Sequence, residues 1–292
     1  MHRFATLHEI QSLDPERDNQ RIMHLSFGNE FPWDSVRALE VALYRTYCMP
    51  AVSGLLDRTQ EFYKHPQRRY DDTAILIAEM CEWGYEHGRG RAALKRMNWV
   101  HGHFKISNDD FLYVLSTFVY EPIRWIDAFA WRRLCTNERL AYYYFWRAVG
   151  TRMGIHDIPP TSEAFAAWAH AYEKTHFRFA ASNRKIALAT RNLFASWFPR
   201  FAAPVVHYGI YALLDDAMLD AFGFPKPLPA TRALVRGGLK LRGRLVRWLP
   251  PRRQAHFFTD GPNRTYPQGY EIARLGPSSL VVKDGARPPS ES

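Results

Sequence analysis

Cysteine is scarce in this sequence of 292 residues. The three cysteines, Cys48, Cys81 and Cys135, lie far apart, and no Cys-x-x-Cys pair occurs. This spacing excludes a disulfide framework and a zinc ribbon, and it favours a reducing, cytoplasmic setting. The N-terminal residues lack the apolar core of a signal peptide, so none is expected.

Long hydrophobic runs and familiar catalytic motifs are also absent. No run of about 18 apolar residues occurs, so the sequence predicts no membrane-spanning helix. The His-Glu-x-x-His, Gly-x-Ser-x-Gly, P-loop and dinucleotide-binding patterns are all missing. Hydrolase, kinase and simple dehydrogenase functions therefore lose their usual support.

Acidic residues are missing from one long segment. No Asp or Glu occurs between Ala221 and Thr259, and the nine Lys and Arg residues there account for most of the net charge of +10. Drawn as a helix, residues 231–253 have one apolar face (Leu234, Gly238, Leu241, Leu245, Trp248) and one basic face (Arg236, Lys240, Arg244, Arg247). This pattern predicts a peripheral helix on an anionic membrane surface. The alternative is a solvated helix whose leucines pack on the core. Nucleic-acid binding is not expected, because aromatic residues are not interleaved with the basic ones.

Apolar and aromatic residues are plentiful, at 47% and 15% of the chain. From Trp33 onward the sequence reads as consecutive helices separated by Pro, Gly and N-cap residues. We therefore predict an all-α fold in which residues 31–256 form a single large helical domain with a buried apolar pocket. Residues 1–30 are expected to be loosely ordered, and residues 257–292 to form an irregular segment with a frayed tail.

Two histidines stand one residue apart in the stretch WVHGHFKISNDDFLYVLSTFVYEP, residues 99–122. On a helix, His101 and His103 would be about 200° apart, so both cannot bind one metal ion. His101 shares a face with Leu94, Met97 and Phe104, which predicts that it is buried. A lone histidine on an apolar face is either a hydrogen-bonded core residue or a ligand, and both possibilities stay open.

A second candidate metal site is the i,i+3 pair His170 and Glu173. This spacing can bring two ligands to one metal ion on a helix, but a solvated pair is the commoner reason for it.

Several motifs in order resemble a known oxygenase family. They are FPWDSVRALEVALYRTYCMPAVSGLL, RRYDDTAIL, RMNWVHGHFKISNDDFLYVLSTFVYEPIRWIDAFAWRRLCTNE and MGIHDIPPT. From about residue 31 to residue 253 the chain resembles the family that unites the mycophenolic-acid-pathway oxygenase with the latex-clearing (rubber) oxygenases, and it is most similar to the mycophenolic-pathway branch. The resemblance implies an all-α fold with buried haem b, or alternatively non-haem iron or manganese. It also implies cleavage or oxidation of a hydrophobic small-molecule or polyisoprenoid substrate by dioxygen.

The resemblance also implies roles for particular residues. Arg96, His101 and Glu138 match catalytic positions, and a wider set matches cofactor-binding positions: Arg96, His101, Asn108, Tyr113 and Arg124. Rubber oxygenases place their iron-ligating histidine in the following helix, where this chain has Leu115. His101 is therefore the candidate metal ligand, with His170 and Glu173 as alternatives. The competing hypothesis is a non-catalytic helical protein that binds an apolar ligand at a membrane surface.

Overall fold

The computed structural model describes residues 3–284, and no strand occurs in that range. The all-α prediction is confirmed. The helices are α1 (Ala5–Ser12), α2 (Asn19–His24), the π-helix η1 (Leu25–Glu30), α3 (Pro32–Tyr47), α4 (Pro50–Thr59), α5 (Glu61–Lys64), α6 (Pro66–Trp83), α7 (Gly88–His101), α8 (Asn108–Phe129), α9 (Thr136–Arg152), α10 (Ser162–His176), α11 (Ala181–Ser196), η2 (Arg200–Ala202), α12 (Ala203–Leu213), α13 (Asp216–Phe222), α14 (Pro229–Arg247), η3 (Phe258–Asp260), η4 (Ile272–Arg274) and α15 (Ser278–Asp284).

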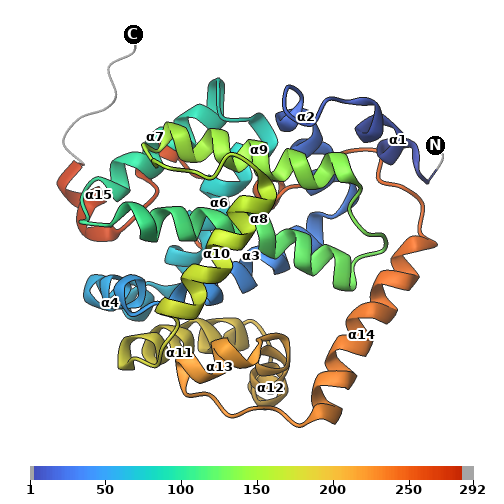
Figure 1. The fold of residues 1–292 in the computed structure, drawn as a ribbon. Coiled ribbons are helices and arrows are strands. Elements are labelled where there is room, and N and C mark those ends of the chain that lie inside the picture. The colour runs from blue at the N-terminus through green and yellow to red at the C-terminus, as the bar shows by residue number, and fades with distance from the viewer. Residues whose placement is uncertain (1–2, 285–292) are drawn as a thin grey trace.

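Helix α8 runs through the middle of the molecule and packs along α3 (Figure 1). It begins where the sequence predicts, because the Ser107 side chain accepts a hydrogen bond from the backbone N–H of Asp110. Asp109 and Asp110 lie in its first turn, where the helix dipole favours negative charge. The central position of α8 lets its side chains reach several neighbouring helices.

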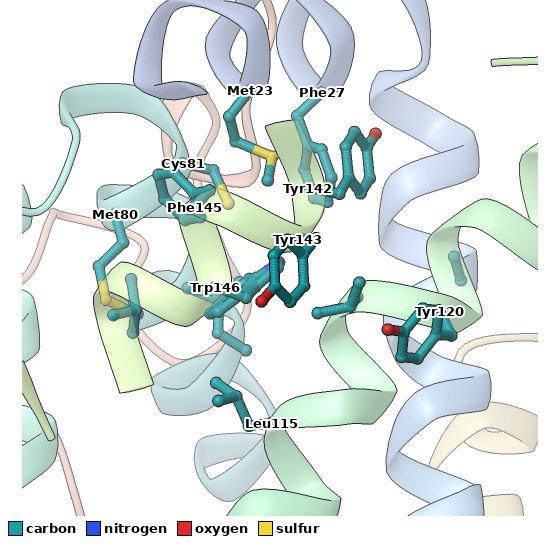
Figure 2. Close-up of a cluster of buried hydrophobic side chains, with 14 of the residues drawn as sticks. Met23, Phe27, Met80, Cys81, Leu115, Tyr120, Tyr142, Tyr143, Phe145 and Trp146 are labelled. Atoms are coloured by element: carbon teal, nitrogen blue, oxygen red, sulfur yellow. The ribbon is translucent and has the colours of Figure 1, made fainter. Parts of the chain in front are cut away.

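Helix α9 carries much of the aromatic core. Tyr142, Phe145 and Trp146 are buried, and they recur at the three- to four-residue spacing that puts side chains on one helix face. Figure 2 shows them meeting Met80 and Cys81 of α6 and Met23 of α2. This cluster accounts for the high aromatic content.

The N-terminal segment differs from the expectation of loose order. Residues 5–30 form α1, α2 and η1, and Ile22, Met23 and Phe27 are buried in the core. The Ser26 hydroxyl also donates to the Glu138 carboxylate across 3.0 Å. The few apolar residues in this polar stretch give only a weak sequence signal for ordered structure. In the fold they nevertheless pack against α6 or α9.

The C-terminal segment is largely irregular and lies along α6. Carboxylates of α6 hold it: Asp71 accepts from the backbone N–H of Thr265 at 2.9 Å, and Asp72 accepts from the Tyr266 hydroxyl at 2.6 Å. Asp72 also accepts from the backbone N–H of Gly276 at 3.0 Å. We call residues 257–277 the C-terminal strap. The expected frayed tail falls mainly on residues 285–292, outside the described part of the chain.

Candidate functional site

A cavity of about 480 Å³ lies between α3, α4, α6, α7, α8 and α9. Its volume is in the range of small-molecule sites. Most of its wall is apolar, including Leu43, Ile77, Val114, Phe118 and Trp146. Gly276 and Pro277 of the C-terminal strap complete the wall. The predicted apolar pocket is therefore present in this fold.

His101, the last residue of α7, faces this cavity. Met97 lines it beside His101, as their helical spacing predicts. Phe104 lines it too, but from the turn after α7, because the helix ends at His101 instead of continuing to Phe104. His103 points elsewhere: its ring is exposed and lies within hydrogen-bond distance, 2.8 Å, of the Trp99 carbonyl. The two histidines of the 99–122 stretch therefore have different environments, and one of them lines the cavity.

The imidazole of His101 has an orphaned atom. Its Nδ1 is buried and has no hydrogen-bond partner among residues 3–284, while Phe111 packs against the ring at 5.3 Å between centroids. Burial lowers the pKa of His101 to about 4, and the charge of Arg69 acts in the same direction. At neutral pH the ring is uncharged, which is the form that binds metals. An unpartnered buried nitrogen is costly in a core, which favours a ligand at this position.

Leu115 lines the same cavity from α8. It is buried next to Trp146 in the cluster of Figure 2. Leu115 and His101 thus face the same cavity from consecutive helices.

Three basic side chains border the cavity: Arg58 of α4, Arg69 of α6 and Lys105 after α7. Arg58 and Lys105 are exposed, whereas Arg69 is half-buried. Within residues 3–284, no Asp or Glu lies within ion-pair distance of these three. Sequence reasoning missed them. Arg69 belongs to the quoted motif RRYDDTAIL, which was the available signal, but spacing alone does not distinguish it from its neighbours.

Four other candidate residues have structural partners outside the cavity wall. The Arg96 Nε donates to the Leu275 carbonyl at 2.6 Å, which fixes the C-terminal strap to α7. Glu138 caps α9 by accepting from the backbone N–H of Cys135 at 2.8 Å and pairs with Arg132. Asn108 exchanges hydrogen bonds with the backbone of His156. Arg124 pairs with Glu121.

Tyr113, the remaining cofactor-binding candidate, and the pair His170 and Glu173 also lie away from the cavity. The Tyr113 hydroxyl donates to Glu173 at 2.8 Å, and Arg45 pairs with the same carboxylate at 3.1 Å. His170 is exposed on α10. In the described chain, no group of three or more His, Cys, Asp or Glu side chains could hold a metal ion. The structure therefore brings one of the candidate site residues, His101, into the cavity.

Two further hollows lie next to the cavity. One of about 50 Å³ shares four wall residues with it: Leu43, Thr73, Ile77 and Phe118. A surface groove of about 510 Å³ near Trp33 and Arg252 shares six wall residues with that hollow: Pro32, Val36, Tyr70, His256, Phe257 and Phe258.

No helix within residues 3–284 has both the length and the apolar character needed to cross a membrane. The exposed hydrophobic side chains instead gather on α12 and α14 and the segments beside them.

Comparison with known sequences identifies relatives. The chain is 30% identical over 244 residues to the ER-bound oxygenase mpaB' of Penicillium brevicompactum, a match that covers 77% of this chain and 58% of that protein. It is 33% identical over 210 residues to the ER-bound oxygenase mpaB of Penicillium roqueforti, covering 66% of this chain and 70% of that protein. The ER-bound oxygenase mpaB of P. brevicompactum is 33% identical over 194 residues, covering 60% of this chain and 49% of that protein.

The match at family level covers most of the helical core. The family described as "ER-bound oxygenase mpaB/B'/Rubber oxygenase, catalytic domain" matches residues 37–248, which include α4 to α13 and His101. The family resemblance read from the motifs is confirmed. The chain belongs to the family of ER-bound oxygenases mpaB and mpaB' and rubber oxygenases.

Proposed function

We propose that this chain is an oxygenase that acts on hydrophobic, isoprenoid-type substrates with dioxygen, using haem b held in the cavity by His101. The observation that carries the proposal is the buried, unpartnered Nδ1 of a neutral histidine that faces an apolar cavity. The family membership supports oxygenase chemistry.

The side chains around the cavity fit a haem group. His101 would supply the nitrogen that holds the iron, and Arg58, Arg69 and Lys105 at the border would pair with the propionates. The apolar walls suit the macrocycle. The described residues offer no cluster of three ligands, so they give less support to a non-haem iron or manganese centre.

Haem iron, when bound, supplies the binding and activation of dioxygen. The protein would position the cofactor and substrate and protect them from water. Leu115, Phe118 and Trp146 keep water from the inner end of the cavity, and His101 stays neutral in this apolar setting. The adjoining hollow and surface groove provide room for an extended hydrocarbon chain.

The first test is the absorption spectrum of the protein produced with iron and haem precursor, combined with elemental analysis. A Soret band with about one haem per chain is expected, and His101→Ala should lose it. His103→Ala is the matched control, because His103 lies two residues along and faces away from the cavity. Wild-type protein without haem would contradict the cofactor assignment. Stoichiometric iron or manganese would then support a non-haem oxygenase, and absence of any metal would favour an apolar-ligand binding protein.

Activity requires a separate measurement. The holoprotein, supplied with a reductant-free buffer, an isoprenoid alkene and labelled dioxygen, should give carbonyl products that contain the label. No dioxygen uptake and no product with haem fully bound would refute the oxygenase function and leave the haem assignment standing.

A further inference from the structure

Helix α14 has three distinct faces. One faces the protein: Arg242 pairs with Asp34 of α3 at 3.0 Å, and its guanidinium lies 3.7 Å from the centroid of the Trp33 ring. On the same side Gly243 is buried, and a Cβ there would lie 2.9 Å from the Ala130 carbonyl oxygen. This close backbone approach fixes the rotation of α14 about its axis and determines which side chains point outward.

The second face is apolar and exposed. Leu234 is 77% exposed, Leu241 56%, Leu245 61% and Trp248 86%. The alternative in which the leucines pack on the core is therefore wrong. The core does not need them, because Val235, Leu239 and Val246 occupy the protein-facing side. Figure 1 shows α14 along one edge of the molecule.

The third face is basic. Arg236, Lys240, Arg244 and Arg247 are all exposed and lie beside the apolar face. Arg236 is at the edge of this face nearest the protein, with its guanidinium 5.0 Å from the centroid of the Phe129 ring. No acidic residue occurs between Ala221 and Thr259 to neutralise them. The helix therefore presents adjacent apolar and cationic strips.

The helix that packs against α14 also carries exposed apolar residues. Phe201 of η2 and Val205 and Tyr208 of α12 recur at helical spacing and are exposed. Helix α12 contacts both η2 and α14. Among the large hydrophobic side chains exposed in the described chain, most belong to residues 198–249: Phe198, Phe201, Val205, Tyr208, Leu228, Leu234, Leu241, Leu245, Trp248 and Leu249. Such a concentration marks an interaction surface.

We propose that α14, with the exposed residues of η2 and α12, docks this chain onto an anionic lipid bilayer. Leucine and tryptophan side chains would enter the boundary between headgroups and acyl chains, while the adjacent arginines and lysine meet anionic headgroups. Charge complementarity selects the bilayer over a second copy of the chain, because a symmetric contact would bring two basic faces together. The inference does not rest on the oxygenase function.

The test is flotation of the full chain with two kinds of vesicle, pure phosphatidylcholine and phosphatidylcholine with about one-third phosphatidylserine. We expect association with the anionic vesicles that weakens as salt rises. Replacing Leu234, Leu241 and Leu245 together by serine should lower vesicle affinity at least about tenfold, and so should replacing the four basic residues by glutamine. Trp83→Ser, at an exposed aromatic residue outside this surface, is the matched control and should bind like the wild type.

Two outcomes would overturn the proposal. One is a wild-type chain that stays unbound on anionic vesicles at low salt. The other is a serine variant that binds as well as the wild type. Circular dichroism and thermal unfolding verify that each variant is folded, and single serine substitutions replace the triple one if it is not. Concentration-dependent dimerisation that the serine variant abolishes, without vesicle binding, would assign the surface to a second copy instead.

Discussion

His101 at the end of α7 and Leu115 in α8 line the same cavity, so two consecutive helices each offer it a position from which a ligand could reach a bound cofactor. In this chain the imidazole is on α7 and the hydrocarbon side chain is on α8. Of these two side chains, only the imidazole of His101 could coordinate a metal ion.

From this relationship we predict that the histidine can be moved from position 101 to position 115. His101→Ala should lower haem content at least about tenfold, and Leu115→His in the His101→Ala background should restore part of it. The new histidine at position 115 would enter the cavity from α8, and its side chain has a volume similar to that of the leucine it replaces. Haem content measured from the absorption spectrum, with unfolding curves for both variants, tests this. A double variant that folds and stays free of haem would mean that the two positions are not equivalent.

Gly150 of α9 lies against the other side of Leu115. A Cβ at Gly150 would overlap Leu115 Cδ2 and lie 3.1 Å from Ile158 Cδ1. Gly150→Ala should therefore push Leu115 toward the cavity and destabilise the fold by about 1–3 kcal/mol in denaturant unfolding. Gly237→Ala in α14 is the control, because no atom lies within 4 Å of the added carbon. That change should be neutral or stabilise by up to about 1 kcal/mol. Equal effects of the two substitutions would refute the packing argument.

Arg45 joins three helices and the start of a fourth. Its guanidinium pairs with Glu121 of α8 at 2.7 Å, with Glu173 of α10 at 3.1 Å and with Asp215, which caps α13, at 2.5 Å. Arg45→Met should leave these carboxylates without their cation and cost about 3–5 kcal/mol of unfolding free energy. Arg21→Met breaks an exposed pair with Glu9 and should cost less than about 1 kcal/mol. A smaller loss at Arg45 than at Arg21 would contradict this.

Glu40 predicts a pH dependence. Burial raises the pKa of its carboxyl to about 7, although Arg37 and the Tyr70 hydroxyl, each 2.7 Å away, favour the charged form. Between its unfolded pKa and pH 7 the folded state holds the extra proton, so this contribution to stability is present at low pH and is lost as pH rises through 7. Glu40→Gln should therefore gain stability relative to the wild type at pH 8, by no more than about 3 kcal/mol, and show little difference near pH 4. Urea unfolding at both pH values tests it, and a difference that does not change with pH would refute it.

Helical periodicity predicted the all-α fold and the inward orientation of Met97 and His101, because both follow from local geometry. Motif matching identified the family, but it assigned site roles to Asn108, Arg124 and Glu138, whose observed partners are backbone groups and neighbouring charges. Motifs contain residues that join helices as well as residues that line a cavity. Only the three-dimensional structure distinguishes residues that join helices from residues that line the cavity. Arg69 shows this too, because its motif does not reveal that it borders the cavity.

The positions of residues 5–30 and of the C-terminal strap have a consequence for how the protein can be divided. The family match covers residues 37–248. A fragment with those limits would lack Met23 and Phe27 from the aromatic core. It would also lack Gly276 and Pro277 from the cavity wall, and would expose the α6 carboxylates that hold the strap. The region of sequence homology therefore omits two kinds of residue: N-terminal residues that fill the core and C-terminal residues that wall the cavity.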